Sequence, residues 1–191
     1  MDIAIVIDRP TAEVRAANAA CRRAGALFFA GGARSVFGWA FADLGASFEY
    51  ALEHKAEGGD EVRRSQETVA QCSWEEAMAA DLTGRRLTRI HPVYLMLRAQ
   101  SLAEKSGSSG AEAALSGLSA DLGQQVRLDA ATYESFAQES ASGMPAIAAI
   151  TGGVAANHIL KAISRKGEPL DNFFLFSIAN GAGEVSRFGK A

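Results

Sequence analysis

The side chains best suited to chemistry are few and far apart in this sequence. His54, His91 and His158 have no second histidine or cysteine at the spacing that zinc sites use. Cys21 and Cys72 form no CxxC pair, and no histidine is placed to activate Cys72 as a nucleophile. We therefore predict no metal site and no catalytic residue. His158 is interpreted as a polar-face or interface residue, and Cys72 as structural.

Three glycine pairs raise the question of a phosphate-binding loop: Gly31-Gly32, Gly58-Gly59 and Gly152-Gly153. None has GxGxxG or GxxxxGK[ST] spacing between a strand and a helix, so no nucleotide or other cofactor is expected to bind this chain. The third pair lies in AIAAITGGVAANHILKAI, which is predicted to be helical on both sides and to begin at Pro145.

Each glycine inside that helix costs about 1 kcal/mol relative to alanine. Close approach of another backbone is the usual gain, so Gly152 and Gly153 are interpreted as packing positions against a sheet or a helix. A ligand that approaches the backbone is the less favoured alternative.

The composition limits the class of protein. The chain has 191 residues, 48% of them hydrophobic and 21% charged, which fits one globular domain or one and a half. A net charge of −3 with both signs interspersed gives no basic footprint, so nucleic acid is not an expected partner. No uninterrupted apolar run of membrane-spanning length and no signal peptide are recognised, which predicts no membrane and a nuclear or cytoplasmic location.

Residues 1–52 are predicted to form a βαβ unit followed by an aromatic strand. DIAIVI is expected to be a strand buried on both faces, and Asp8 and Pro10 are expected to start the helix that Gly25 ends. ALFFAG then forms the second, parallel strand. Because a chain rarely opens at its most buried strand, we expect the second half of a larger α/β fold. Its first half is then either absent or supplied by another polypeptide.

The aromatic strand carries Phe37, Trp39 and Phe41 at alternating positions, which places all three on one face. They belong either to the domain core or to a surface that a partner covers, and the sequence leaves these two alternatives even.

The rest of the chain is divided into three parts. Residues 53–70 are predicted to be a mobile loop, and residues 71–142 a helical insertion. Residues 143–191 are predicted to return to the main fold as a helix and a β-hairpin around Asn180-Gly181.

Within the helical part, Ser73 and Glu76 have the spacing of a capping box. A helix is expected over residues 91–105, a flexible joint over 106–117, and shorter helices over 120–128 and 129–140.

Several segments together resemble a known family. NAACRRAG, ALFFAGG and SVFGWAFADLG, followed by MPAIAAITGGVAANHILKAI and NFFLF, resemble the Rossmann-like adenylation domain (ThiF-type). That domain is shared by bacterial sulfur-carrier adenylating enzymes and the activating enzymes of ubiquitin-like proteins. The order of the segments is most similar to the small-subunit (Aos1-like) branch of the SUMO-activating enzymes.

The chain departs from the family pattern at two places. Asn157 and His158 stand where the family has Gln-Glu, and Arg9 and Pro10 stand where active members have an aspartate and an asparagine. A cation and an imino ring cannot coordinate Mg²⁺, which takes oxygen ligands.

The resemblance therefore implies a non-catalytic subunit. ATP and Mg²⁺ would be bound by a Uba2-like large subunit, which would also carry the thioester-forming cysteine, and the ubiquitin-like modifier would be reached through the complex. The residues expected at partner-facing or packing surfaces are the following: Phe37, Trp39, Phe41, Gly152, Gly153, Asn157 and His158. Two alternatives stay open: the inactive half of a single-chain ubiquitin-activating enzyme, and a self-associating binding module.

Overall fold

The computed structural model describes residues 2–55, 62–138, 143–179 and 181–189. Its strands are β1 (Ile3–Ile7), β2 (Leu27–Arg34), β3 (Phe37–Asp43), β4 (Phe48–Lys55), β5 (Val62–Val69), β6 (Phe173–Ser177) and β7 (Gly183–Ser186). Its helices are α1 (Thr11–Ala24), α2 (Trp74–Met78), the 3₁₀ turn η1 (Leu87–Arg89), α3 (Pro92–Ser106), α4 (Ala111–Leu122), α5 (Ala130–Ala137) and α6 (Pro145–Ser164).

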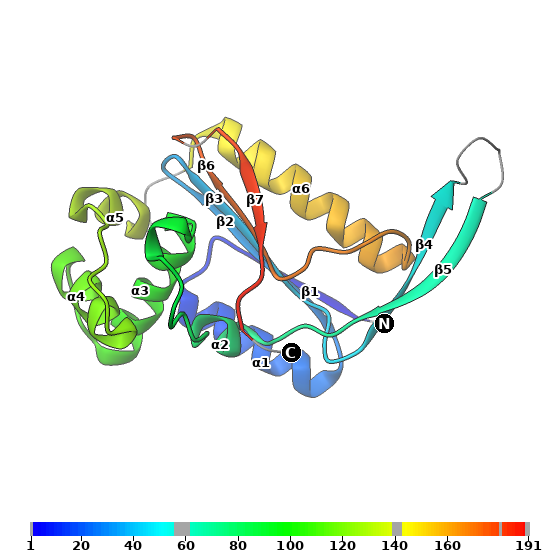
Figure 1. Cartoon of the computed structure of the whole chain (residues 1–191), viewed down its shortest axis with the longest axis horizontal. Coiled ribbons are helices and arrows are strands. Elements are labelled where there is room, and N and C mark those ends of the chain that lie inside the picture. The colour runs from blue at the N-terminus through cyan, green and yellow to red at the C-terminus, as the bar shows by residue number, and fades with distance from the viewer. Residues whose placement is uncertain (1, 56–61, 139–142, 180, 190–191) are drawn as a thin grey trace.

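The main sheet is mixed and has the order β1-β2-β3-β6-β7. β1 and β2 are parallel, which confirms the predicted crossover through α1, and the other pairs in this sheet are antiparallel. β2 and β3 are nearly continuous runs of buried residues because helices cover both faces of the sheet at these central strands (Figure 1). The chain is thus a mixed α/β fold, as the sequence predicts.

The prediction that the first strand is buried on both faces is wrong. β1 is an edge strand that pairs only with β2, and Ile5 and Ile7 are 52% and 54% exposed. Its apolar composition favours burial, but among the described residues neither a further strand nor α6 covers this part of the sheet.

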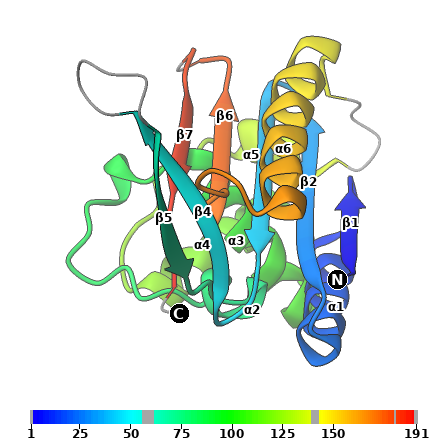
Figure 2. The ribbon, with the colours of Figure 1, turned by 90° about the vertical axis from the view of Figure 1, so that its right-hand side faces the viewer.

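The helices form two layers. α1, α2 and α3 pack on one face of the sheet, with α4 and α5 beyond α3, and α6 alone crosses the other face (Figures 1 and 2). The first face carries an aromatic cluster in which the Trp74 ring lies 5.1 Å from that of Phe41 and 5.7 Å from that of Phe173, centroid to centroid. Trp74 is fully buried, so α2 belongs to the core of the sheet domain.

The predicted helical insertion over 71–142 is helical but is not separate from the sheet. Its first helices share one hydrophobic cluster with β3 and β6. The flexible joint expected over 106–117 is wrong, because α4 starts at Ala111, and the helix expected over 120–128 is wrong, because α4 ends at Leu122. The glycines and serines of this segment suggest a linker, but its alanines favour a helix, because alanine is the strongest helix former.

The loop predicted over 53–70 is also wrong in large part. β4 and β5 pair in antiparallel register from Phe48 with Val69 onward and form a separate two-stranded ribbon. Charged residues such as Glu53 and Arg64 interrupt the apolar alternation from which a strand is predicted. In the ribbon these two side chains form a cross-strand ion pair at 2.9 Å. Residues 56–61, with Gly58-Gly59, lie outside the described residues.

Most helix ends follow the predicted signals. Gly25 and Gly107 adopt left-handed conformations at the ends of α1 and α3, and Ser73 and Glu76 form the capping box of α2. Asp8 does not cap α1, because its carboxylate instead accepts a hydrogen bond from the backbone amide of Ala33. The hairpin of β6 and β7 is confirmed, with Asn180 itself outside the described residues.

Candidate partner-binding surface

The aromatic strand faces the interior of this chain. Phe37, Trp39 and Phe41 are at most 6% exposed. Phe37 packs edge-on against Phe136 of α5, and Phe41 lies 4.8 Å from the ring of Phe173. Of the two alternatives that the sequence leaves even, the structure shows the domain core, and these rings are not available to a partner.

The close backbone approach expected at Gly152 and Gly153 does not occur within this chain. A Cβ atom added to either glycine would meet no atom within 4 Å, since Gly153 faces outward from α6 and Gly152 borders the small open space between α6 and β1. The tight contact lies on the strand side instead. A Cβ on Gly38 of β3 would overlap the hydroxyl of Thr151 and lie 3.1 Å from Cγ2 of Ile147, so Gly38 is what lets α6 sit close to the sheet.

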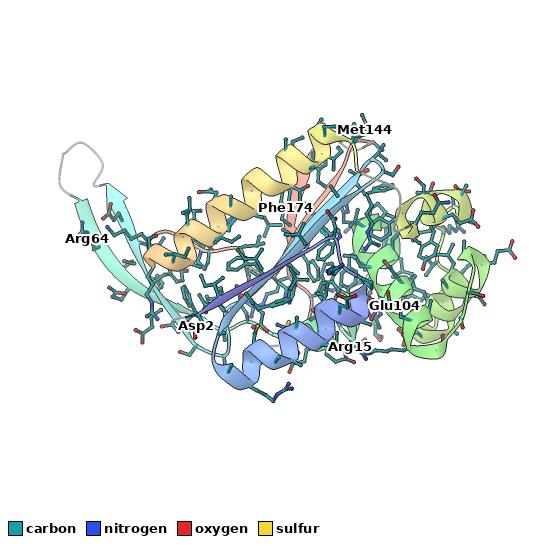
Figure 3. The ribbon with its side chains drawn as sticks, turned by 180° about the vertical axis from the view of Figure 1, so that it is seen from behind. Asp2, Arg15, Arg64, Glu104, Met144 and Phe174 are labelled. Atoms are coloured by element: carbon teal, nitrogen blue, oxygen red, sulfur yellow. The ribbon has the colours of Figure 1, made fainter. Side chains whose placement is uncertain are left out.

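The outward face of α6 is apolar and smooth. Small residues run along it, namely Ala149, Gly152, Gly153 and Ala156. Large apolar side chains flank them: Met144 is 45% exposed at the start of the helix (Figure 3), Ile150 41%, Leu160 64% and Ile163 55%. No Asp, Glu, Lys or Arg occurs between Pro145 and Leu160. A helix at the edge of a domain normally turns charged residues outward, so this face is unusual.

The open side of β1 continues this surface. Ile3 packs in the same hydrophobic cluster as α6, so Ile5 and Ile7, which alternate with it, point to the α6 side of the sheet. Helix α6 lies over β2 and β3 and leaves β1 beside it uncovered (Figure 2). A small cavity of about 90 Å³ joins the two elements, with Ile7 on one wall and Gly152 on the other.

We define the outer apolar surface by the residues of β1 and α6 that are exposed on this side: Ile5, Ile7, Met144, Ala149, Ile150, Gly152, Gly153, Ala156, Leu160 and Ile163. A contiguous exposed apolar patch of this kind marks an interaction site more often than a free surface.

By length and composition alone, α6 is apolar enough to span a membrane. Only 17% of its most apolar stretch is buried in the structure. This composition is weak evidence for a membrane, because apolar helices of water-soluble proteins meet the same criterion. Here the inward side of α6 covers β2 and β3, and Ile147 and Ala162 are fully buried.

The two residues that depart from the family pattern differ in exposure. Asn157 is exposed, and His158 is half-buried. Burial, and to a lesser degree the nearby Lys161 ammonium, lower the pKa of His158, so its imidazole is neutral at pH 7. Its Nδ1 is buried and has no hydrogen-bond partner among the described residues.

The N-terminal end of α1 is occupied by this chain's own carboxylate. Glu104 of α3 accepts hydrogen bonds from the backbone amides of Thr11 and Ala12, at 3.2 and 2.7 Å, and from the Thr11 hydroxyl at 2.6 Å (Figure 3). Arg9, in the preceding turn, pairs with Glu13 at 3.5 Å. The amides that favour an anion at a helix start are therefore satisfied internally. No spacing in the sequence links Glu104 with Thr11.

A second polar network missed by the sequence analysis holds the sheet to α1. The buried carboxylate of Asp43 accepts hydrogen bonds from the Arg22 guanidinium, at 2.7 and 3.0 Å, and from the Asn18 amide at 2.7 Å. Asn18 in turn accepts from the backbone amide of Trp74, which ties α2 to α1. Only the fold brings these residues together, so no local pattern could reveal them.

The cysteines are buried thiols. Burial is the main cause that raises the pKa of Cys21 and of Cys72, which keeps both protonated. The Cys72 thiol donates to the Phe188 carbonyl at 3.1 Å, an arrangement that fits packing and not nucleophilic chemistry. Among the described residues, no group of three His, Cys, Asp or Glu side chains is arranged to hold a metal ion.

Comparison with known proteins shows what this chain is similar to. No family model matches the sequence. SUMO-activating enzyme subunit 1 from Rattus norvegicus is 29% identical over 202 residues, which covers 88% of this chain and 57% of the relative. The chain is similar to SUMO-activating enzyme subunit 1. The Danio rerio protein of the same name is 27% identical over 195 residues, with 85% and 56% covered.

These similarities confirm the predicted resemblance to this branch of the modifier-activating enzymes. The chain spans about 57% of the length of the curated relatives it matches. A shorter match of 47% over 53 residues links 28% of this chain with 5% of Ubiquitin-like modifier-activating enzyme 7 from Mus musculus.

Proposed function

We propose that this chain is a non-catalytic part of a two-subunit enzyme that adenylates a SUMO-like modifier and passes it on as a thioester. The observation that carries the proposal is similarity over most of the chain to proteins named as a subunit of the SUMO-activating enzyme. In this proposal a Uba2-like large subunit binds ATP and Mg²⁺ and holds the thioester-forming cysteine.

The outer apolar surface supports a role in assembly. It exposes large apolar side chains on two neighbouring elements, and burying such side chains stabilises a complex by about 25 cal/mol for each Å² removed from water. The small residues at Gly152, Gly153 and Ala156 would let another backbone approach α6 closely. Of the packing and partner-facing roles expected for the glycine pair, the open space outside α6 favours a contact with another polypeptide segment.

The start of α1 supports the absence of adenylation chemistry in this chain. A phosphate at the amides of Thr11 and Ala12 would have to displace Glu104, and its charge would meet the Glu104 carboxylate at close range. Arg9 and Pro10 supply no oxygen ligand from their side chains for Mg²⁺.

Co-expression tests this proposal. The chain, and any longer product of the same gene, is produced with a tagged large subunit from the same organism, and affinity purification followed by size-exclusion chromatography reports assembly. The purified pair is then incubated with modifier and ATP, and a thioester that reducing agent removes is measured on a gel. We expect one complex and an ATP-dependent thioester on the large subunit. Failure of both products to co-purify with the large subunit would contradict the proposal.

A second candidate is an adenylation half within a longer, single-chain activating enzyme. The 47% identity to Ubiquitin-like modifier-activating enzyme 7 favours this candidate for the 53 residues that match, although these cover only 5% of that protein. The length of the transcript distinguishes the two candidates, because a single-chain enzyme requires a second adenylation domain in the same reading frame.

A further inference from the structure

A second surface, away from α6, concentrates positive charge. The segment before and through η1 presents Arg85, Arg86 and Arg89, and Arg127 follows α4. All four side chains are exposed, and none has an ion pair among the described residues. This local excess of positive charge contrasts with the net charge of −3 of the whole chain.

These arginines border two adjoining cavities. One of about 450 Å³ lies between the η1 segment and β7 with the residues directly after it, and one of about 480 Å³ lies between η1 and the segment after α4. Arg86 and Ile90 line both, so the two cavities adjoin, and we call them together the arginine groove. Arg187 is the fifth arginine of the groove, and Glu184 is its only acidic lining residue.

The floor of the groove is apolar and fixed. Ile90, Leu95 and Phe188 lie at its base and are at most 8% exposed. Arg187 is held in place by its hydrogen bond to the Ala70 carbonyl at 2.7 Å and its ion pair with Asp171 at 3.5 Å. The other arginines border this base, so a ligand in the groove can place an aliphatic side chain against the base and carboxylates against the arginines.

We propose that this arginine groove binds an acidic peptide segment of a partner protein, in which glutamate or aspartate residues flank an aliphatic residue. Guanidinium groups present paired donors that match the two oxygens of a carboxylate, and clusters of arginine recognise acidic motifs in other domains. The apolar floor accepts the aliphatic side chain. A nucleic acid fits less well, because the chain as a whole repels a polyanion and the groove floor offers no exposed aromatic ring on which a base could stack. The proposal does not depend on the subunit assignment.

Fluorescence anisotropy with the full chain tests the groove. The probe is a fluorescein-labelled peptide of about twelve residues that alternates glutamate pairs with leucine, and the matched peptide has glutamine at every glutamate. The groove variant is Arg86→Gln with Arg89→Gln. The control variant is Arg23→Gln with Lys166→Gln, which removes the same charge from exposed positions outside the groove. Melting curves establish that both variants fold.

We expect the glutamate peptide to bind, the glutamine peptide to bind at least tenfold more weakly, and the groove variant to lose about tenfold in affinity while the control variant loses less than twofold. Binding should also weaken as salt rises from about 50 to about 300 mM. Equal losses in the groove and control variants would overturn the proposal, because attraction would then follow overall charge. Equal binding of the two peptides would overturn it too, as would tighter binding of a single-stranded oligonucleotide of equal charge.

Discussion

The two faces of the main sheet are covered very differently. On one face, α1, α2 and α3 close over an aromatic cluster whose central ring, Trp74, is fully buried. On the other face, α6 is the one helix described, Phe48 and Tyr50 of β4 share its hydrophobic cluster, and β1 remains half exposed, with apolar side chains pointing outward from α6 and β1. The first face is completed by this chain. The second has the character of a surface that another polypeptide completes, and the difference indicates where assembly would occur.

The closed face should be the more sensitive of the two to loss of a side chain. Trp74→Ala removes a ring that packs against Trp39, Phe41 and Phe173, and should lower the free energy of unfolding by about 3–5 kcal/mol. Denaturant unfolding of the isolated chain measures this change.

Trp74→Phe is the conservative control for that experiment. It should cost much less, because the indole Nε1 of Trp74 has no hydrogen-bond partner to lose among the described residues. Equal costs for Trp74→Ala and Trp74→Phe would contradict the assignment of the ring to a packed core.

Single methyl groups can compare how tightly the inner and the outer side of α6 are packed. Gly38→Ala adds a Cβ that overlaps Thr151, and should destabilise the chain by about 1–3 kcal/mol, with partial recovery in the double variant Gly38→Ala, Thr151→Ala. Gly152→Ala and Gly153→Ala add the same group to open space within a helix, and should each stabilise the chain by about 0.5–1 kcal/mol. Thermal unfolding of the four variants measures these changes. A loss of stability in Gly152→Ala as large as that in Gly38→Ala would contradict the view that α6 is tightly packed on its sheet side and open on its outer side.

The pH dependence of stability should also differ between the faces, by a smaller amount. Burial lowers the pKa of His91, whose Nδ1 accepts a hydrogen bond from the backbone amide of Val93 at the start of α3. A histidine with a lowered folded-state pKa binds protons more readily when unfolded, so stability is lost as the pH falls below the ordinary value of about 6.5.

His91→Asn should reduce this loss of stability between pH 7 and pH 5, because asparagine caps a helix without titrating. His158→Asn, on the half-buried side of α6, should reduce it less. Urea midpoints at several pH values report both slopes. If His91→Asn loses as much stability between pH 7 and pH 5 as the wild type, groups other than His91 cause the loss of stability at acidic pH.

Local signals in the sequence predicted much of the fold. Pro92 and Gly107 mark the two ends of α3, and Gly25 marks the end of α1, because each residue favours a backbone conformation that those positions need. The parallel crossover of β1 and β2 followed from the order of the elements. The alternation of Phe37, Trp39 and Phe41 fixed their common face, but only the packing of α2 and α5 showed that this face is interior.

Features that depend on what lies next to a segment were not predictable. The apolar composition of β1 predicts burial on both faces, and the composition of α6 predicts a packed helix, but apolar sequence does not tell whether the residues that cover it belong to the same chain. The Asp43 network and the contact of Glu104 with α1 join residues distant in sequence, so no spacing could indicate them. The β4–β5 ribbon was missed because its charged residues pair across strands and show no apolar alternation.

The claim that another polypeptide completes the α6 face can be tested directly with a matched pair of variants. Ala156→Glu places one negative charge at the centre of the outer apolar surface, and Ala113→Glu places the same charge on an exposed position of α4. The affinity of each variant for the co-purified large subunit is measured by titration, after unfolding curves show that both variants fold. We predict that Ala156→Glu weakens binding at least tenfold and that Ala113→Glu changes it less than twofold. Wild-type affinity in Ala156→Glu would contradict the claim.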